Sequence, residues 1–280
     1  MEADFKDRVV IVTGASSGIG RALALRLADQ GAFMALAARD AERLGILAEE
    51  CNRRGGKAVP VPTDVSVEGQ CQALVNCTVK EFGQLDMLIN NAGISVGSKL
   101  EDLPDLHLFK QVMDVNFYGM VYCTYYALPH LKASRGRLVN VSSLGGKLAI
   151  PYNTSYIASK FAMHGFSDSL RMDLTGSGVS VTVVCPYWVV TEFHERFMNK
   201  DGKPKGPEGR AMYTEKMMTA DRCAQIILKA ATQRKREVLM GPGTWGVWMK
   251  MIAPGFVDRI AVNRVLKPAV IRLQKGKDKN

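Results

Sequence analysis

Short apolar runs alternate with segments of helical periodicity along most of this chain, and this alternation restricts the possible folds more than any other feature. Strands are expected at residues 9–13, 33–38, 59–61, 85–90, 137–142, 179–185 and 237–240. Helices are expected at residues 21–30, 40–54, 66–82, 106–131, 155–175 and 220–233. Apolar strands separated by helices are typical of a parallel sheet covered on both faces. The sequence therefore predicts one doubly wound α/β domain over residues 1–242.

Three glycines in the spacing Gly-x-x-x-Gly-x-Gly follow the first expected strand. Gly14 would permit a tight turn, Gly18 would let backbone amides approach a pyrophosphate, and Gly20 would let the next helix pack close to the sheet. The positive end of that helix suits phosphate groups. A glycine-rich turn without a ligand is the alternative, but the strand–turn–helix context favours a dinucleotide site. We therefore expect a Rossmann-type domain whose ligand binds beyond the carboxyl ends of the strands.

Tyr156 and Lys160 stand four residues apart in the expected helix 155–175, so both project from one face. An ammonium beside a phenol favours the phenolate and would lower the pKa of Tyr156 toward neutrality. A tyrosine tuned in this way can exchange a proton with an alcohol or carbonyl oxygen. Because this spacing arises by chance in many long helices, it gains weight only together with the glycine turn.

The glycine spacing and the Tyr156-x-x-x-Lys160 pair together resemble the short-chain dehydrogenase/reductase family over about residues 6–241. Further matches are Asp64, the run Asn90-Asn91-Ala92-Gly93, Asn116 and Ser143. The resemblance implies four catalytic residues: Asn116, Ser143, Tyr156 and Lys160. Tyr156 would be the general acid in carbonyl reduction, and Lys160 would tune it. Ser143, which precedes Tyr156 by 13 residues and is therefore preferred over Ser142, would orient the substrate oxygen. Asn116 would hold a relay water.

The same resemblance implies a nicotinamide coenzyme. Asp64 and Val65 would flank the adenine, while the Val189 backbone and the Thr191 hydroxyl would contact the carboxamide. The implied coenzyme-binding residues are Gly14, Ser16, Ser17, Gly18, Ile19, Gly20, Arg39, Asp64, Val65, Asn91, Ala92, Gly93, Tyr156, Lys160, Pro186, Val189 and Thr191.

The end of the second strand bears on which coenzyme is used. NAD enzymes usually place a carboxylate there for the ribose 2′-hydroxyl, but this chain has Ala38 followed by Arg39. A guanidinium without that carboxylate favours a 2′-phosphate, and Ser16 could add a hydrogen bond. NADP(H) is therefore expected, and NAD(H) stays open if Asp40 takes the ribose.

The substrate loop, at about residues 187–218, departs from the family pattern, because Tyr187 stands where a glycine is usual after Pro186. Tyr187 and Trp188 could form an aromatic wall over the site or simply pack, and His194 is expected to be an exposed loop residue. Apolar residues fall in segments that line the family's pocket: Leu144, Ile150, Phe193, Met198, Tyr213 and Met217. They favour a bulky apolar substrate such as a steroid, retinoid, lipid or xenobiotic carbonyl.

The C-terminal extension, residues 243–280, supplies +6 of the net charge of +10. Its apolar residues recur at helical spacing, broken at Pro254-Gly255, and it resembles extensions in the 11β-hydroxysteroid dehydrogenase branch of the family. One interpretation is peripheral membrane contact through a basic amphipathic surface. The other, which we favour, is a subunit interface or a cover over the substrate pocket.

Composition limits other functions. Six cysteines without a Cys-x-x-Cys pair are expected to be buried thiols rather than disulfides or zinc ligands, and no metal site is expected. The first eight residues do not resemble a targeting segment, so we expect a cytoplasmic protein. The body of the chain shows no basic face with stacking aromatics, which argues against nucleic-acid binding.

These observations predict an NADP(H)-dependent oxidoreductase that interconverts a secondary alcohol and a ketone or aldehyde on an apolar substrate. By family resemblance, a homo-oligomer (dimer or tetramer) would form through the long helices. Two alternatives stay open: a 3-oxoacyl-thioester reductase, and a cofactor-binding sensor or scaffold without turnover.

Overall fold

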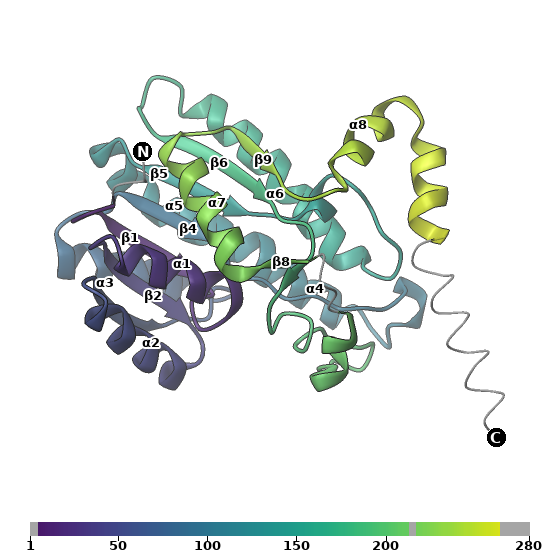
Figure 1. Ribbon diagram of the computed structural model, residues 1–280, viewed down its shortest axis with the longest axis horizontal. Helices are drawn as coiled ribbons and strands as arrows, with labels where there is room; N and C mark the ends of the chain where they lie inside the picture. Colours follow the sequence, from purple (N-terminus) through teal and green to yellow (C-terminus); the bar gives the residue numbers. More distant parts are fainter. Residues whose placement is uncertain (1–4, 213–216, 264–280) are drawn as a thin grey trace.

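Seven parallel strands form one central sheet in the order β3-β2-β1-β4-β5-β6-β9. The computed structural model describes residues 5–212 and 217–263. The strands are β1 Val9–Thr13, β2 Phe33–Ala38, β3 Lys57–Pro62, β4 Met87–Asn90, β5 Arg137–Val141, β6 Ser180–Cys185 and β9 Glu237–Leu239. Figure 1 shows them side by side with helices in front and behind. The predicted doubly wound, single-domain fold is confirmed.

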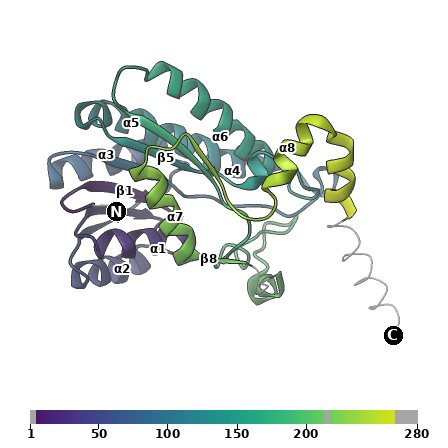
Figure 2. The same cartoon turned by 45° about the horizontal axis from the view of Figure 1, so that its top comes forward.

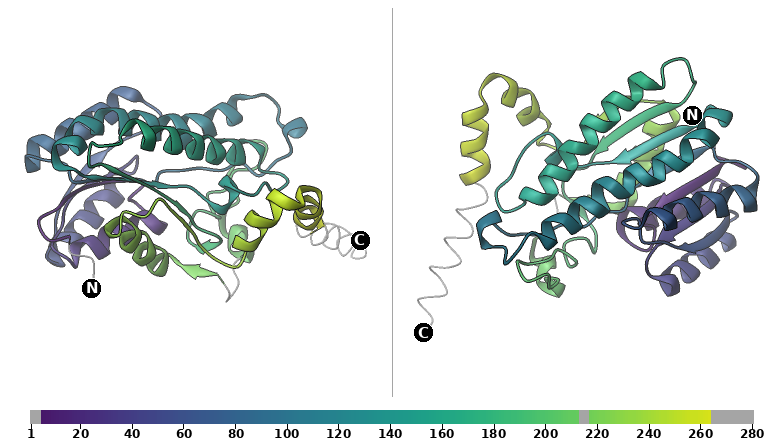
Figure 3. Two further views of the ribbon diagram at one scale, coloured as in Figure 1. Left: turned by 90° about the horizontal axis from the view of Figure 1, so that it is seen from above. Right: turned by 180° about the vertical axis from the view of Figure 1, so that it is seen from behind.

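Helices cover both faces of this sheet (Figure 3). The helices are α1 Gly18–Ala28, α2 Ala41–Arg53, α3 Glu68–Phe82, α4 His107–Met113, α5 Gly119–Ser134, α6 Thr154–Asp173, α7 Ala220–Thr232 and α8 Thr244–Ile252. Along β1, Val10 and Val12 pack into the core beneath α1, α2 and α7. Val9 and Ile11 pack into the core beneath α3 and α5. The strand is apolar throughout because its side chains alternate between two buried layers.

The strand order reverses between β1 and β4, which pair in parallel. In open α/β sheets the ligand crevice lies outside the carboxyl ends of the strands at such a point. A separate two-strand ladder is formed by β7 Val189–Val190 and β8 Met218–Thr219. It joins the two ends of the substrate loop near the carboxyl ends of the central strands (Figure 2). The topology therefore brings the glycine turn and the substrate loop to one side of the domain.

The structure refines several predicted elements. The expected helix 106–131 is α4 and α5 joined by a π-helical segment, Asp114–Tyr118. The expected strand 59–61 extends over Lys57–Pro62 because it pairs with β2 along its whole length. Cys77 is exposed, contrary to the expectation for all six thiols, whereas the other five are buried and all six are free.

The extension begins with α8 and continues in a second helical run over residues 254–263. Pro254 opens that run, at the helical position where its missing amide proton costs nothing. Both helices stand beside the end of the sheet to which the strands point (Figure 1). Within residues 5–212 and 217–263, no helix combines the length and the apolar character needed to span a membrane.

Candidate active site

In the glycine turn between β1 and α1, the backbone lies close to the segment after β4 and to Thr191 of the substrate loop. Gly14 and Gly18 have φ angles of +64° and +54°, which favour glycine. A Cβ added at Gly20 would overlap the Gly14 carbonyl oxygen and stand 2.7 Å from Asn91 Nδ2. A Cβ added at Gly18 would stand 3.1 Å from Thr191 Cβ. Close approach of the backbone therefore accounts for all three glycines.

The amino end of α1 offers an environment for an anion. Ser17 is the N-cap without a side-chain capping bond, and the first turn contains no acidic residue. Arg196 of the substrate loop donates a hydrogen bond to Ser17 Oγ at 2.9 Å. Unpaired helix amides and the positive end of the helix dipole stabilise phosphate groups. With Arg196 beside them, these groups fit a dinucleotide pyrophosphate.

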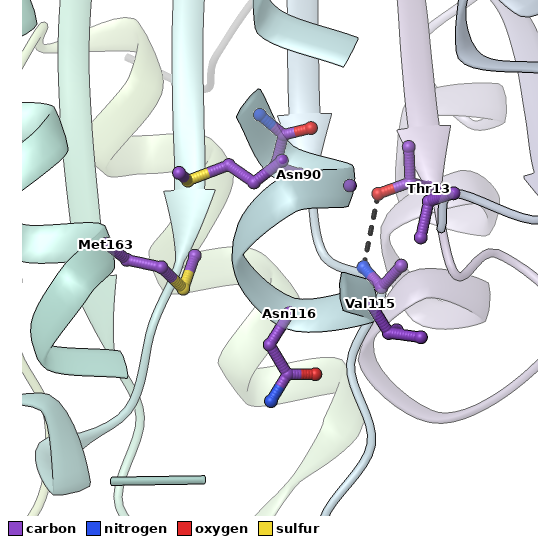
Figure 4. Close-up of a pocket in the computed structure, with 9 residues that line it drawn as sticks. Thr13, Asn90, Val115, Asn116 and Met163 are labelled. Atoms are coloured by element: carbon purple, nitrogen blue, oxygen red, sulfur yellow. Dashed lines mark hydrogen bonds between the residues drawn. The ribbon is translucent and has the colours of Figure 1, made fainter. Parts of the chain in front are cut away.

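Side-chain hydrogen bonds tie the carboxyl ends of β1 and β4 together. Asn91 Nδ2 donates to the carbonyl oxygens of Thr13 at 2.9 Å and Gly14 at 3.2 Å. Thr13 Oγ1 accepts from the amides of Asn91 at 2.9 Å and Ala92 at 3.1 Å. A gap too narrow to hold a water molecule adjoins them (Figure 4), lined also by Val65, Asn90, Val115, Asn116, Gly119, Met120 and Met163. The implied coenzyme residues Val65, Asn91 and Ala92 therefore meet at the switch point.

Asn116 is buried in the π-helical segment. Its Oδ1 accepts from the Ile94 amide at 2.8 Å, and its Nδ2 donates to the Ile94 carbonyl at 3.0 Å and to Ser159 Oγ at 2.9 Å. A Cβ at Gly93 would lie 3.4 Å from Asn116 Oδ1 and 3.9 Å from Lys160 Nζ. The side chain thus joins the strand end after β4 to the helix that carries the tyrosine. π-helical turns inside α-helices are frequent at functional sites.

Tyr156, Lys160 and Ser143 meet where β5 gives way to the turn before α6. Lys160 Nζ donates to the Val141 carbonyl at 2.9 Å and lies 5.6 Å from the centre of the Tyr156 ring. Ser143 Oγ accepts from the Gly145 amide at 3.0 Å. Burial raises the pKa of Tyr156 to about 12, and its hydrogen bond with Ser143 partly opposes this. Burial also lowers the pKa of Lys160 to about 8.

The prediction that the pKa of Tyr156 falls is therefore wrong for the chain without a bound coenzyme. The phenolate and the ammonium are both charged forms, and burial disfavours each of them. Lys160 also directs its ammonium to the Val141 carbonyl. The spacing of Tyr156 and Lys160 was sufficient to place them together, but desolvation decides the direction of the shift.

Burial of Lys160 predicts a pH-dependent cost to folding. Its pKa is about 8 in the folded chain, against 10.5 for the group in water. Between these values the unfolded chain binds more protons, so the Lys160 contribution to the free energy of unfolding rises with pH. Below the lower value the full cost, on the order of 3 kcal/mol, is present. The stability of Lys160→Met relative to wild type should therefore fall by about 2 kcal/mol between pH 7 and pH 9.5.

Urea unfolding at several pH values measures this difference. Lys132→Met, at an exposed position of α5, is the matched control and should show no such trend. A Lys160→Met difference that stays constant over the same range would contradict the prediction.

Aromatic side chains form a continuous wall that ends on Tyr156. Ring centres lie 6.3 Å apart for Tyr187–Trp188, 5.2 Å for Trp188–His194, 6.1 Å for His194–Phe193 and 6.0 Å for Phe193–Tyr156. Phe197 extends the wall, 6.1 Å from Phe193. We call Tyr187, Trp188, Phe193, His194 and Phe197 the aromatic wall.

His194 was expected to be exposed, but it is buried, with 5% of its surface exposed. Its ring stacks on Trp188 at an angle of 22°, and desolvation lowers its pKa. The expectation was wrong because an isolated loop histidine carries no sequence signal of the tryptophan that covers it.

The substrate loop is also tied to the coenzyme side by ion pairs that sequence reasoning missed. Glu192 pairs with Arg43 and with Arg196, each at 2.8 Å. Asp40 caps α2, accepting from the Arg43 amide at 3.0 Å, and also pairs with Arg43 Nε at 3.3 Å. These groups are about half exposed, so each pair contributes little stability. No local pattern indicates the pair between Arg43 and Glu192, because these two residues lie 149 positions apart in the chain.

The remaining predicted residues take separate positions. Asp64 accepts from the amide and hydroxyl of Ser66, at 2.9 and 2.6 Å. The Pro186 carbonyl accepts from Leu144 at 2.9 Å, Val189 is buried, and Thr191 Oγ1 accepts from the Phe193 amide at 3.3 Å. Arg39 is exposed at the end of β2. Tyr213 lies outside the described residues.

One face of α8 packs against the turn that carries Ser143. Lys250 Nζ donates to the Lys147 carbonyl at 3.3 Å and lies 4.8 Å from the centre of the Phe161 ring. Val247 packs on the small core that contains Leu144. The other side of the extension leaves apolar side chains exposed: Trp245, Trp248, Met251, Ile252 and Phe256. The extension thus contacts the site with one face and presents a large apolar face outward.

Comparison with known proteins agrees with this arrangement. The short chain dehydrogenase family model matches residues 8–202. The 11-beta-hydroxysteroid dehydrogenase-like 3 protein of Arabidopsis thaliana is 34% identical over 258 residues, covering 90% of this chain and 79% of that protein. The 11-beta-hydroxysteroid dehydrogenase of Pinus massoniana is 36% identical over 240 residues, covering 84% and 67%. A solved short chain dehydrogenase/reductase of Burkholderia phymatum, in complex with NAD, has a TM-score of 0.81 at 26% identity, covering 90% of this chain and 96% of that one.

Fold and site together define a nucleotide-binding oxidoreductase. The chain belongs to the short-chain dehydrogenase/reductase family, within the branch of 11β-hydroxysteroid dehydrogenase-like proteins.

Proposed function

We propose that this protein is an NADP(H)-dependent oxidoreductase that interconverts a secondary alcohol and a ketone or aldehyde on a bulky apolar substrate. The observation that carries the proposal is the meeting of Tyr156, Lys160 and Ser143 at the end of the aromatic wall. A steroid, retinoid or other lipid-like carbonyl suits such a surface, because flat aromatic groups bury apolar rings well.

The chain's own residues would handle the oxygen and the proton. When bound, the nicotinamide coenzyme supplies or accepts the hydride. In reduction, Tyr156 gives its hydroxyl proton to the substrate oxygen, and Ser143 donates a hydrogen bond as charge develops there. Lys160 stabilises the phenolate that Tyr156 leaves. The aromatic wall excludes water from the reacting oxygen.

The residues that the resemblance implies for the coenzyme have the chemistry needed to bind a dinucleotide. The amino end of α1 would hold the pyrophosphate, and Asn91-Ala92-Gly93 would line the groove. The Val189 backbone and the Thr191 hydroxyl would contact the carboxamide. Arg39 would face the 2′-phosphate, since Asp40 is already engaged by Arg43.

The first test measures NADPH and NADH oxidation against steroid, retinal, aromatic and acyl-thioester carbonyls. NADPH turnover on the apolar ketones or aldehydes supports the proposal. Preference for the acyl thioesters would instead favour a 3-oxoacyl-thioester reductase. Tight NADPH binding with no turnover on any carbonyl would favour a cofactor-binding sensor or scaffold.

Arg39→Ala tests the choice of coenzyme. Loss of a charge-assisted hydrogen bond is worth about 1.5–3 kcal/mol, so the ratio of kcat/KM for NADPH to that for NADH should fall by about 10- to 100-fold. Arg53→Ala, at an exposed position of α2, is the control and should leave the ratio unchanged. A wild-type enzyme that prefers NADH would overturn the NADP(H) proposal directly.

We also propose a homo-oligomer formed through the long helices, to be measured by light scattering. The outward apolar face of the extension suits either a partner subunit or a lipid surface. Flotation with anionic vesicles separates these two, because only lipid contact makes the intact chain float.

A further inference from the structure

His164 is buried directly behind the turn that carries Ser143, and the proposed mechanism gives it no role. It lies on α6, four residues after Lys160, and is 8% exposed. Its Nδ1 is 3.2 Å from Glu237 Oε1. Its Nε2 is 3.2 Å from Ser142 Oγ and 3.6 Å from Cys185 Sγ. The imidazole therefore has polar partners on both of its nitrogens.

The partners of His164 decide which nitrogen carries the proton. His164 and Lys147 hold the pKa of Glu237 at about 2, so this carboxylate is charged and can only accept. Nδ1 is therefore the donor to Glu237, and Nε2 shares a hydrogen bond with Ser142. Cys185 lies on the Nε2 side of the ring. Burial raises the pKa of its thiol to about 12, so the thiol stays protonated.

The contacts of His164 enclose the turn formed by residues 143–147, which we call the Ser143 turn. Ser142, just before the turn, bonds to His164. Lys147, at its end, pairs with Glu237 Oε1 at 2.7 Å. Between them, a Cβ added at Gly146 would stand 2.7 Å from His164 Nε2 and from Ser142 Oγ. The ring thus packs against the turn. Glu237 on β9 contacts Lys147 at one end of the turn and is connected through His164 to Ser142 at the other.

We propose that His164 is a positioning residue that, with Glu237, closes a hydrogen-bonded bracket around the Ser143 turn and holds the Ser143 hydroxyl beside Tyr156. The inference rests on the proposed function for its catalytic consequence, but the bracket can be measured without a substrate. Loss of the bracket would let the turn move, and small displacements of a group that orients a substrate reduce the rate strongly.

A metal site is the competing interpretation of the same side chains. Ligand atoms of His164, Cys185 and Glu237 all lie within 4.8 Å of one another. However, Glu237 and Cys185 contact opposite nitrogens of one ring, whereas a metal binds only one of them. The contacts of His164 with Glu237 on one nitrogen and with Ser142 and Cys185 on the other therefore favour a hydrogen-bonded bracket over a metal site.

His164→Phe and His164→Gln separate hydrogen bonding from packing. Phenylalanine keeps the planar shape but loses both polar contacts, whereas the amide of glutamine can still form a hydrogen bond with Ser142. Hydrogen exchange of the turn amides is the direct readout, because the amides of Leu144, Gly146 and Lys147 donate to Pro186, Ser143 and Leu144. Exchange there should be at least about tenfold faster in His164→Phe and closer to wild type in His164→Gln, with β1 amides unchanged.

Steady-state kinetics supply the second readout. We expect His164→Phe to lower kcat by about tenfold with the KM for NADPH unchanged, and His164→Gln to recover most of that loss. Met172→Ala, at an exposed site on the same helix, should match wild type in both measurements. Wild-type exchange and wild-type kcat in His164→Phe would overturn the proposal, as would zinc that is retained through gel filtration with chelator and lost in that variant.

The two proposals fail separately. Absence of turnover by the wild-type chain counts against the proposed function, while amide exchange still decides whether His164 supports the turn. Turnover that is insensitive to His164→Phe counts against the bracket and leaves the proposed function intact.

Discussion

Tyr156→Phe should lower kcat for NADPH-dependent carbonyl reduction by about 10³-fold, because it removes the only atom of the side chain that can give up a proton. The phenyl ring would keep its contact with Phe193, 6.0 Å away between ring centres. NADPH affinity should stay within about threefold of wild type, since positioned proton transfer acts on the chemical step.

Steady-state turnover and equilibrium binding of NADPH measure the two expected effects of Tyr156→Phe. Tyr125→Phe provides the matched control, since Tyr125 is an exposed tyrosine on α5. It should behave as wild type in both experiments. A Tyr156→Phe enzyme that keeps a tenth or more of the wild-type kcat would show that another group delivers the proton.

Gly20→Ala should destabilise the chain by about 3 kcal/mol and abolish tight coenzyme binding. The added methyl would overlap the Gly14 carbonyl oxygen and press on Asn91 Nδ2, and overpacking of this kind typically costs about 1–3 kcal/mol. Relief of the clash would have to move the glycine turn, whose backbone approaches the proposed pyrophosphate site.

Gly165→Ala is the matched control for Gly20→Ala. Gly165 also lies inside a helix, α6, but a Cβ there meets nothing within 4 Å. It should therefore gain about 0.5–1 kcal/mol from the lower chain entropy of alanine in the unfolded state. Urea unfolding of both variants checks the pair, and equal shifts for the two would refute steric overlap as the cause.

Most of the fold was predictable because its signals are local. The run Val9–Thr13 is apolar at every position since β1 has a buried layer on each face. Asp40 announced the start of α2 and does cap it, at 3.0 Å from the Arg43 amide. The break in the long expected helix at Asp114–Tyr118 had no such signal, because the π-helical turn depends on where Asn116 meets the segment after β4.

In the candidate site, too, the features set by local spacing were predictable and those set by distant contacts were not. The four-residue spacing of Tyr156 and Lys160 places both on one face of α6, and the glycine spacing suits the tight turn whatever surrounds it. Their electrostatics were not predictable in this way. The pKa of Tyr156 rises rather than falls because burial, which no local pattern reports, outweighs the hydrogen bond with Ser143.

The sequence by itself determined the order of strands and helices, the glycine turn and the spacing of the Tyr–Lys pair, because backbone geometry and hydrophobic periodicity act over a few residues. Tertiary structure alone decided the burial of His194, the ion pair of Glu192 with Arg43, and the bracket that joins Ser142, Lys147, His164 and Glu237. Those features arise from contacts between segments that lie far apart in the chain, and from the desolvation that such contacts impose.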